Sequence, residues 1–191
     1  MNKVQKSIVL TVFTMAITSI FFLTIGTPAF AVEYANEKCG VSIQYPEDWE
    51  VENDDYKGDG LRSFVTISPD SDEVLNQFSI KIWDISDFRE KTIEYVSEIF
   101  TPESTEEIKN DVIQNNIIEV GGFPAQKLAY SEEFQGYITY SMGINILAYD
   151  KVYQIYLEAD DQDIFDKYVP LVDEVANSIK ISKPNFEGIN C

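Results

Sequence analysis

The sequence predicts a single α+β domain in which a central antiparallel sheet is flanked by helices. Two observations carry this prediction. After an N-terminal leader, segments that alternate apolar and polar residues come in two groups, and an amphipathic helix follows each group. In addition, no internal repeat, low-complexity tract or interdomain linker divides the 191 residues. We therefore assign one domain to residues 32–181, between a leader at residues 1–31 and a C-terminal tail at residues 182–191.

The leader has the layout of a secretory signal peptide. Lys3 and Lys6 precede an uncharged run over residues 8–25, and Ala29-Phe30-Ala31 is a small-x-small cleavage sequence. We expect cleavage after Ala31 and a secreted or cell-surface, extracytoplasmic domain. The alternative is an uncleaved anchor, because the run approaches the roughly 20 residues that span a bilayer.

The first group of strands begins at residues 41–45, where apolar and polar side chains alternate. Pro46 ends this segment because it has no N–H to donate, and Trp49 and Val51 then return to the core. The following elements are predicted from composition and alternation: a loop at residues 54–60, strands at 64–68 and 78–83, and a turn at 68–72.

The helix after this group is predicted to begin at Thr92, whose hydroxyl can cap it, and to end at Pro102. Its apolar residues share one face: Ile93, Val96, Ile99 and Phe100. Ser104 and Glu107 have the spacing of a capping box, which predicts a second, short helical piece.

The second group of strands is predicted at residues 112–120 and 125–130, followed by a hairpin that reverses near Asp150-Lys151. In the first strand of the hairpin, polar residues occupy the face opposite the predicted core: Thr139, Ser141, Gly143 and Asn145. The inward residues alternate with them: Ile138, Tyr140, Met142, Ile144 and Ile146 before the reversal, and Tyr153, Ile155 and Leu157 after it.

The last helix opens on the acidic residues 160–163, which suit the positive end of a helix dipole. Pro170 predicts a late start or a kink, and Lys180 and Lys183 suit the C-terminal end. The predicted buried face consists of Phe165, Tyr168, Val169, Val172, Ala176 and Ile179.

The charge excludes nucleic acid as a partner. The chain has 14 Lys plus Arg against 33 Asp plus Glu, a net charge of −19, and loss of Lys3 and Lys6 with the leader makes it −21. Such a surface repels nucleic acid and anionic lipid, so membrane contact is expected only through an uncleaved leader. We interpret the acids mainly as a solvated surface; a basic partner or a cation is the alternative.

Two cysteines stand near the two ends of the domain, at Cys39 and Cys191. Export permits a disulfide between them, because domain termini are often close in space. The bond would close a loop of about 150 residues and stabilise by roughly 4 to 5 kcal/mol in the chain-entropy model. The alternatives are two thiols, or an intermolecular bridge through Cys191.

Catalysis is not expected. The chain contains no His, which excludes a Ser-His-Asp triad, a Cys-His pair and an imidazole metal site. It also has no Gly-x-Ser-x-Gly elbow and no glycine-rich phosphate loop. A hydrolase that uses paired carboxylates is the less favoured alternative, because no pair is marked by its spacing.

The acidic loop at residues 52–60 superficially resembles a calcium loop. Counted from Asp55, an EF-hand would place Lys57 at a ligand position and Thr66 at the twelfth, so that motif fails. A looser calcium or manganese site remains the alternative function, at Asp54, Asp55 and Asp59 or at Asp160, Asp161 and Asp163. For the second set helix capping is the favoured interpretation, and no other cofactor is expected.

The hairpin is rich in tyrosine, and some of these residues are predicted to lie on its outer face. Outward tyrosines can form a contact patch for a protein or glycan partner, although tyrosine is also an ordinary strand residue. The residues are Tyr137, Tyr140, Tyr149, Tyr153 and Tyr156.

Three motifs in order resemble the PsbP-like domain family, and the likeness covers residues 34–181. Residues 40–49 (Gly-Val-Ser-Ile-Gln-Tyr-Pro-Glu-Asp-Trp) are similar to its opening strand. Gly121–Ala125 followed by Leu128 and Tyr130 is similar to its mid-domain turn and strand. The closing helix and its exit are matched by Tyr168-Val169-Pro170 and by Asn177-Ser178-Ile179-Lys180-Ile181.

The resemblance implies an α/β/α sandwich and an exported archaeal or bacterial protein that assists other proteins without catalysis. The best-known members are extrinsic subunits of photosystem II that help retain its manganese and calcium. The absence of His means that no imidazole ligand can be transferred to this chain, and the leader shows no thylakoid transit region. We therefore expect an accessory protein that binds a protein partner, including a membrane complex, at the cell exterior.

Overall fold

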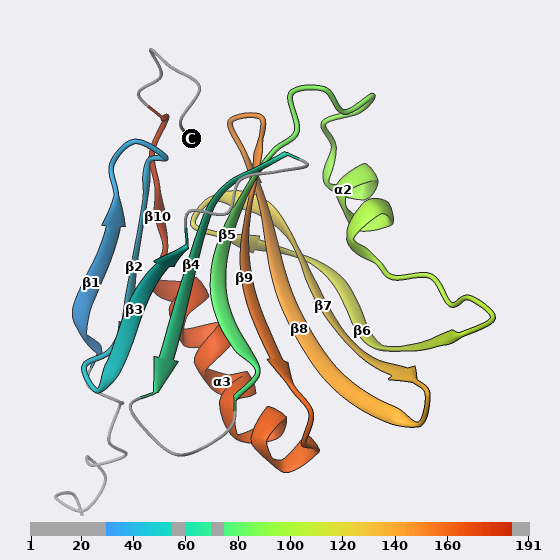
Figure 1. Cartoon of the computed structure of the whole chain (residues 1–191). Coiled ribbons are helices and arrows are strands. Elements are labelled where there is room, and N and C mark those ends of the chain that lie inside the picture. Colours follow the sequence, from blue (N-terminus) through green and yellow to red (C-terminus); the bar gives the residue numbers. More distant parts are fainter. Residues whose placement is uncertain (1–29, 55–59, 70–74, 185–191) are drawn as a thin grey trace, which may run out of the picture.

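The computed structural model describes residues 30–54, 60–69 and 75–184. They form a large antiparallel sheet, a small antiparallel sheet and two helices (Figure 1). The α+β class and the central antiparallel sheet predicted from the sequence are confirmed. No helix in the described ranges has the length and apolar character needed to cross a bilayer.

The large sheet has seven strands in the order β3-β4-β5-β9-β8-β7-β6, and every neighbouring pair is antiparallel. Its strands are β3 (Trp49–Asp54), β4 (Leu61–Pro69), β5 (Gln77–Asp84), β6 (Ile108–Val120), β7 (Phe123–Phe134), β8 (Tyr137–Ala148) and β9 (Lys151–Ala159). The small sheet consists of β1 (Phe30–Asn36), β2 (Val41–Pro46) and β10 (Lys180–Ile181) in the order β1-β2-β10.

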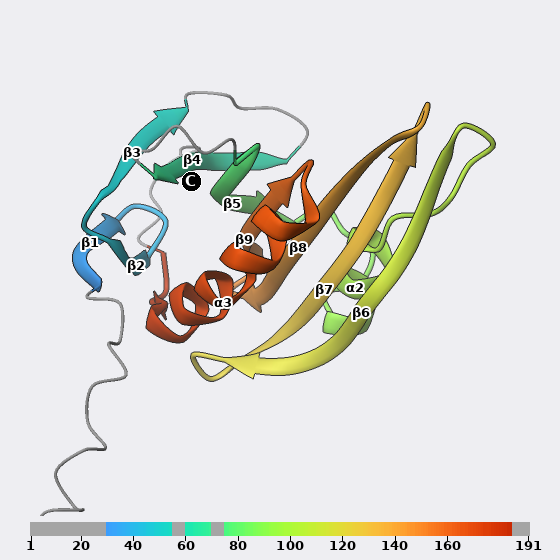
Figure 2. The same ribbon diagram turned by 90° about the horizontal axis from the view of Figure 1, so that it is seen from below.

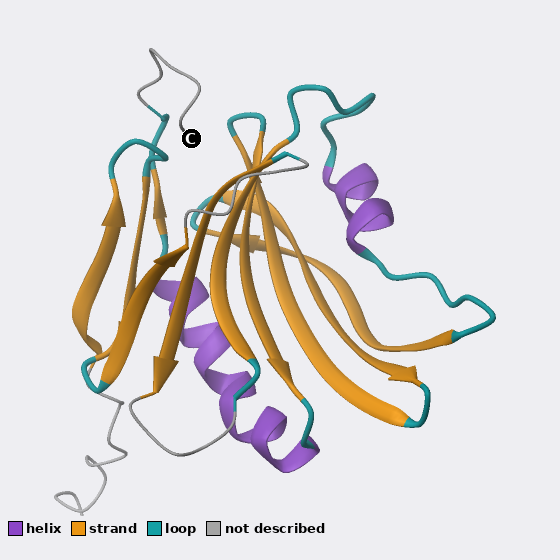
Figure 3. Ribbon diagram, viewed as in Figure 1, coloured by secondary structure: helices purple, strands orange, loops and turns teal. Residues whose placement is uncertain are grey.

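The two helices lie on opposite faces of the large sheet. Adjacent strand residues point to opposite faces, and on β7 Lys127 contacts Asp173 of α3 (Gln162–Ser178) while Gln126 contacts α2 (Ile93–Phe100) through the carbonyl of Ser97. Figure 3 shows the helices separated by the strands. The predicted layering of helix, sheet and helix is therefore confirmed.

The main core lies between the large sheet and α3. Trp49 of β3 packs edge-to-face against Phe78 of β5 at 5.4 Å and against Tyr168 of α3 at 5.5 Å between ring centroids. These contacts join the first strands of the chain to its last helix, and such aromatic pairs stabilise beyond the area they bury. A smaller core under α2 contains Ile85, Ile93, Val96 and Val152.

Three consecutive two-residue turns connect β6, β7, β8 and β9. Each has two residues with positive φ, as type I′ hairpin turns require. The pairs are Gly121 and Gly122, Gln135 and Gly136, and Tyr149 and Asp150. The last turn lies one residue before the predicted reversal, so Lys151 belongs to β9, where it is buried and lies 3.5 Å from Asp84.

The small sheet brings the two ends of the domain together. Ser182 donates its backbone N–H to the carbonyl of Gly40 at 2.8 Å, and β10 pairs with the start of β2. Gly40 has a φ of +67°, and a Cβ at this position would collide with the Ser182 carbonyl. Only glycine can therefore occupy this contact without displacing the backbone.

Several expectations were wrong in detail. The second helical piece does not form. Instead, the Thr105 hydroxyl accepts hydrogen bonds from the amides of Glu107 and Ile108, and the chain enters a strand, β6, at Ile108. The helix α3 starts well before Pro170 and ends at Ser178, so Lys180 lies in β10 instead of on the helix. The strands β1 and β10 were not predicted.

Candidate partner-binding surface

Exposed apolar side chains gather on one half of the molecule. Most of those in the described ranges lie along β6 and around the β7–β8 turn. Figure 2 shows these strands on one side of the ribbon. The β6 set is Val112, Ile113 and Ile117, with Ile99 of α2. We call the set at the turn, Phe134, Tyr137 and Ile138, the tip patch; these side chains are 40%, 79% and 44% exposed. Phe134 and Tyr137 are cross-strand partners and share one face of the hairpin, and Ile138 lies on the other.

The tip patch protrudes because β8 is longer than its inner neighbour. The β8–β9 pairing begins at Tyr140, opposite Ala159, whereas the β7–β8 pairing continues to Tyr137, opposite Phe134. The first three residues of β8 therefore have β7 on one side and no strand on the other among the described residues. The positive φ values of Gln135 and Gly136 allow the tight turn that presents these side chains.

A groove of about 550 Å³ lies beside the tip patch, between the start of β8 and the start of α3. Its wall includes Tyr140, whose ring packs on Phe165 at 5.8 Å and whose hydroxyl donates to Gln162 Oε1 at 3.5 Å. The groove is lined by Gly136, Tyr137, Ile138, Tyr140, Asp160, Asp161 and Gln162. It thus combines aromatic rings with carboxylates.

The groove carboxylates are held by defined contacts. Asp161 caps α3 by accepting from the amide of Ile164 at 3.0 Å, as the capping interpretation of this acidic run predicts. Asp160 accepts from Asn76 Nδ2 at 2.6 Å. Both acids therefore give the groove wall a fixed negative charge.

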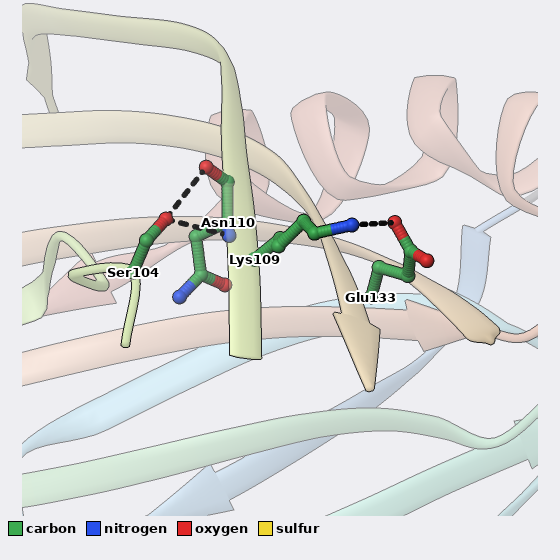
Figure 4. A network of polar contacts seen from close by, with 4 residues as sticks. All are labelled: Ser104, Lys109, Asn110 and Glu133. Carbon is green, nitrogen blue, oxygen red and sulfur yellow. Dashed lines mark hydrogen bonds and ion pairs between the residues drawn. The ribbon is translucent and has the colours of Figure 1, made fainter. Parts of the chain in front are cut away.

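The start of β6 is tied down close to this surface (Figure 4). The Ser104 hydroxyl accepts from the backbone N–H of Asn110 at 2.9 Å and donates to its carbonyl at 3.2 Å. Lys109 forms an exposed ion pair with Glu133 of β7 at 3.4 Å. Such an exposed pair stabilises little, but it uses the one base of β6.

A chain of side-chain amides crosses the sheet under α2. Gln126 donates to Asn115 at 3.0 Å and accepts from Asn145 at 2.9 Å, and Asn145 accepts from Gln154 at 2.8 Å. Trp83 Nε1 continues the chain by donating to Gln154 at 3.4 Å. Sequence patterning placed Asn145 on a polar outer face; α2 covers that face, so the residue is buried.

A second polar cluster lies on the same face, away from α2. Lys81 Nζ lies 4.1 Å from the centroid of the Tyr156 ring, and the Tyr156 hydroxyl donates to Glu158 at 2.6 Å. Burial raises the pKa of Tyr156 above its usual range and lowers the pKa of Lys81, while Glu158 opposes the second shift. Ser79 is fully buried beside them, and its hydroxyl has no hydrogen-bond partner among the described residues.

The five hairpin tyrosines do not form one outer patch. Tyr153 is buried and donates its hydroxyl to the carbonyl of Cys39 at 2.8 Å, and Tyr156 belongs to the polar cluster. Tyr137 and Tyr149 are exposed, but they stand at opposite ends of β8. Only Tyr137 and Tyr140 line the groove. The apolar partners of Tyr137 were missed, because Phe134 stands outside the predicted strands.

The suggested metal and disulfide sites stay predictions. Within residues 30–54, 60–69 and 75–184, no three His, Cys, Asp or Glu side chains are grouped as metal ligands would be, and Asp160, Asp161 and Asp163 are included in that statement. The side chains of Asp54, Asp55 and Asp59 lie outside the described residues. Cys39 is buried, and its neighbour Gly40 contacts Ser182. The predicted partner, Cys191, also lies outside the described residues.

Comparisons with known proteins identify the fold through structure alone. No family model and no curated protein matches the sequence. Cyanobacterial PsbP (CyanoP) from Synechocystis sp. PCC 6803 is similar in structure, with a TM-score of 0.61 and 19% identity over 83% of this chain and 96% of that one.

Two further solved structures match less well. A Pseudomonas aeruginosa protein of unknown function, described as a putative regulator, has a TM-score of 0.49 and 12% identity over 81% of this chain and 98% of its own. The Saccharomyces cerevisiae Ran-binding protein Mog1p has a TM-score of 0.48 and 8% identity over 78% and 94%. The structural similarity to CyanoP shows that this chain has a PsbP-like fold. At 19% identity the similarity supports the fold alone.

Proposed function

We propose that this protein is an exported, non-catalytic accessory protein of the PsbP-like family that binds a protein partner through the tip patch and its groove. The observation that carries the proposal is the exposure of Phe134, Tyr137 and Ile138 on a protruding hairpin. The PsbP-like fold and the three sequence motifs support the family, and the leader supports export to the cell exterior.

The side chains of the tip patch are exposed to a degree that packing within the domain does not require. Tyr137 is 79% exposed and stands at a turn, where a polar residue would serve the backbone as well. Exposed apolar side chains that cluster and adjoin a concave surface are typical of interaction sites, and tyrosine is enriched among the residues that dominate binding. A partner side chain could enter the groove between Tyr137 and Tyr140.

The charge of the groove favours a basic partner surface. Asp160 and Asp161 line it, and the one nearby base on β6, Lys109, is already paired with Glu133. A Lys or Arg of the partner would meet fixed carboxylates at the groove wall, which raises the association rate and selects against acidic surfaces. A subunit of a membrane complex with a basic exterior loop fits this description.

Binding is favoured over catalysis by the chemistry of the surface. The carboxylates of the groove cap a helix and accept from an asparagine, and the chain has no His to act as a base near neutral pH. The buried Tyr156 hydroxyl has a raised pKa, which holds it protonated. These groups are arranged to support structure and contact.

The test is site-specific photo-cross-linking on intact cells of the source organism. A photoreactive phenylalanine analogue at Tyr137 is expected to give a reproducible adduct with one protein. The matched control is the same analogue at Tyr149, which is also exposed but lies at the far end of β8. Excess unlabelled domain should compete with the adduct, and a Phe134→Ser, Tyr137→Ala double variant should not.

Identical adducts from both positions, or none from Tyr137, would show that the tip patch is not the binding surface. Export is tested separately by recovering the protein from the cell exterior and sequencing its N-terminus, which we expect to be Val32. Recovery with the leader intact would favour the anchored form.

A further inference from the structure

We propose that the outer edge of β6, from Asn115 to Glu119, binds an extended, lysine- or arginine-rich segment of another polypeptide as an added strand. This inference is independent of the tip patch, because it rests on main-chain groups of β6. In Figure 2 β6 forms the outer margin of the large sheet, and it pairs only with β7 among the described strands.

The outward main-chain groups in the first half of β6 already have hydrogen-bond partners. The Ser104 hydroxyl accepts from the N–H of Asn110 and donates to its carbonyl. The Thr105 N–H donates to the carbonyl of Ile108 at 2.8 Å, and the Thr105 hydroxyl accepts from the N–H of Ile108 at 3.1 Å. Because main-chain groups alternate between inward and outward along a strand, the outward residues here are the even-numbered ones.

The second half of β6 is open. A bulge between Val112 and Gln114 inserts one residue against β7, so the outward residues become the odd-numbered ones, Asn115, Ile117 and Glu119. No described residue hydrogen bonds to the outward main-chain groups of these three residues. An unpaired edge of this kind is a template for strand addition.

The open half of β6 is also fixed in its extended conformation by contacts with neighbouring elements. The Asn115 side chain accepts from Gln126 at 3.0 Å and donates to Thr101 Oγ1 at 3.1 Å, which fixes the strand to α2 and β7. Ile113 and Ile117 are 60% and 50% exposed, and they offer β-branched side chains for contact. A preorganised edge loses little conformational entropy on binding.

The net negative charge of α2, of the segment that joins it to β6 and of β6 itself favours a basic occupant, and Glu119 lies in the open half. Between α2 and the end of β6 the base Lys109 is paired with Glu133, whereas the exposed acids have no described ion-pair partner. These acids are Glu94, Glu98, Glu103, Glu106, Glu107, Asp111 and Glu119. A second copy of this chain, with a net charge of −19, would place acids against acids, so we commit to a cationic strand.

The experiment uses two acetylated peptides of about nine residues, one alternating lysine with valine and the other glutamate with valine. Binding to residues 32–191 is measured by calorimetry at low salt and by amide hydrogen exchange. We expect the lysine peptide to bind, to protect the amides of Asn115, Ile117 and Glu119, and to weaken with added salt. The glutamate peptide should bind at least tenfold more weakly.

Two variants separate main-chain pairing from side-chain contact. Ile117→Pro removes one outward N–H without removing a bond to β7, so it should weaken the lysine peptide tenfold or more. Ile117→Thr keeps that N–H and the β-branched shape, and should change binding by less than threefold. Retained exchange protection in β7 and β8 shows that each variant is folded. If the proline variant unfolds, the test rests on whether the lysine peptide protects the β6 amides of the unaltered protein.

Three results would overturn the proposal: no lysine-peptide binding, equal binding of both peptides, or protection confined to residues outside β6. Sedimentation of the free protein at increasing concentration supplies a fourth. A dimer that Ile117→Pro dissolves would mean that a second copy occupies the edge. A failure at Tyr137 in the cross-linking experiment would leave these outcomes unaffected.

Discussion

At the scale of single residues, two buried tyrosines of β9 determine how the fold responds to high pH. Burial raises the pKa of Tyr153 to about 12, and the charge of Tyr149 adds to the shift. The pKa of Tyr156 is raised further by burial, with Tyr130 and Glu158 contributing. In both cases the folded protein favours the protonated phenol.

We therefore expect the free energy of unfolding to fall as the pH rises above 10. Tyrosine in the unfolded chain ionises near pH 10, whereas Tyr153 does so near 12 in the folded protein, so the unfolded state loses its proton first. In this window each such tyrosine lowers stability by about 1.4 kcal/mol per pH unit. Urea unfolding between pH 8 and 11.5 measures the slope.

Tyr153→Phe should flatten that slope and, at pH 8, cost about 1 kcal/mol for the lost hydrogen bond to the Cys39 carbonyl. Tyr137→Phe, at an exposed position, is the control and should leave the slope unchanged. Equal slopes for Tyr153→Phe and the unaltered protein would refute the role of Tyr153.

Residue-level prediction from the sequence was weakest for buried polar groups. The alternation in β8 correctly identified Met142, Ile144 and Ile146 as core residues. The same rule assigned Ser141 and Asn145 to a solvated face, although both are buried. Alternation reports which residues share a face; whether another element covers that face depends on contacts far along the chain.

At the scale of elements, α2 is joined to the sheet by hydrogen bonds as well as by its small core. Gln126 Nε2 lies 3.3 Å from the Ser97 carbonyl and 3.0 Å from Thr101 Oγ1, at the C-terminal end of the helix. The same side chain continues the amide chain through Asn115 and Asn145. One residue of β7 therefore couples α2 to its two neighbouring strands.

Gln126→Leu should destabilise the protein by about 1 to 3 kcal/mol, because its buried partner Asn145 loses a hydrogen bond while remaining desolvated. For a domain of this size the midpoint of thermal unfolding should fall by roughly 2 to 4 °C per kcal/mol. Hydrogen exchange should also quicken in α2.

Gln44→Leu, at an exposed side chain, is the matched control for this substitution and should change the midpoint little. A Gln126→Leu protein as stable as the original, with α2 amides equally protected, would show that the small apolar core alone holds the helix.

The sequence predicted elements well where apolar periodicity was strong. The strand at 41–45, the Thr92 cap and the long hairpin all appear. Prediction failed at Ser104–Glu107, where hydroxyls hydrogen bond to the edge of β6 instead of capping a helix. It also failed at Lys180, which pairs with Ser42 between the strands β10 and β2. Of the tip patch, Tyr137 was predicted as a contact residue and Phe134 was not, because the shape of this surface depends on β8 extending beyond β9.

At the scale of the whole molecule, the first and last described strands meet at the small sheet. Ser182 donates a hydrogen bond to Gly40, the neighbour of Cys39, and Cys191 lies only nine positions after Ser182 in the sequence. Nine residues can span up to about 30 Å, so the tail can return to Cys39. The predicted disulfide is therefore compatible with the described fold.

We expect the exported protein to be about 2 Da lighter before reduction than after it, as one disulfide requires, and to run as a monomer without reductant. Reduction should lower the free energy of unfolding by roughly 4 to 5 kcal/mol, because the bond closes most of the chain. Cys191→Ser should reproduce this loss and abolish the effect of the reductant. Two thiols that react fully in the folded protein would contradict the prediction.

The arrangement of the small sheet also has a mechanical consequence. The strand β1 begins opposite the end of β2, at Pro46, whereas β10 ends opposite its beginning, at Val41. In the cleaved protein, where Val32 lies opposite Tyr45, tension between Val32 and Ile181 would therefore run along the strands and strain their perpendicular hydrogen bonds together, in shear, instead of opening them one at a time. A force applied to these two segments would load the small sheet before the large sheet, the tip patch and the β6 edge.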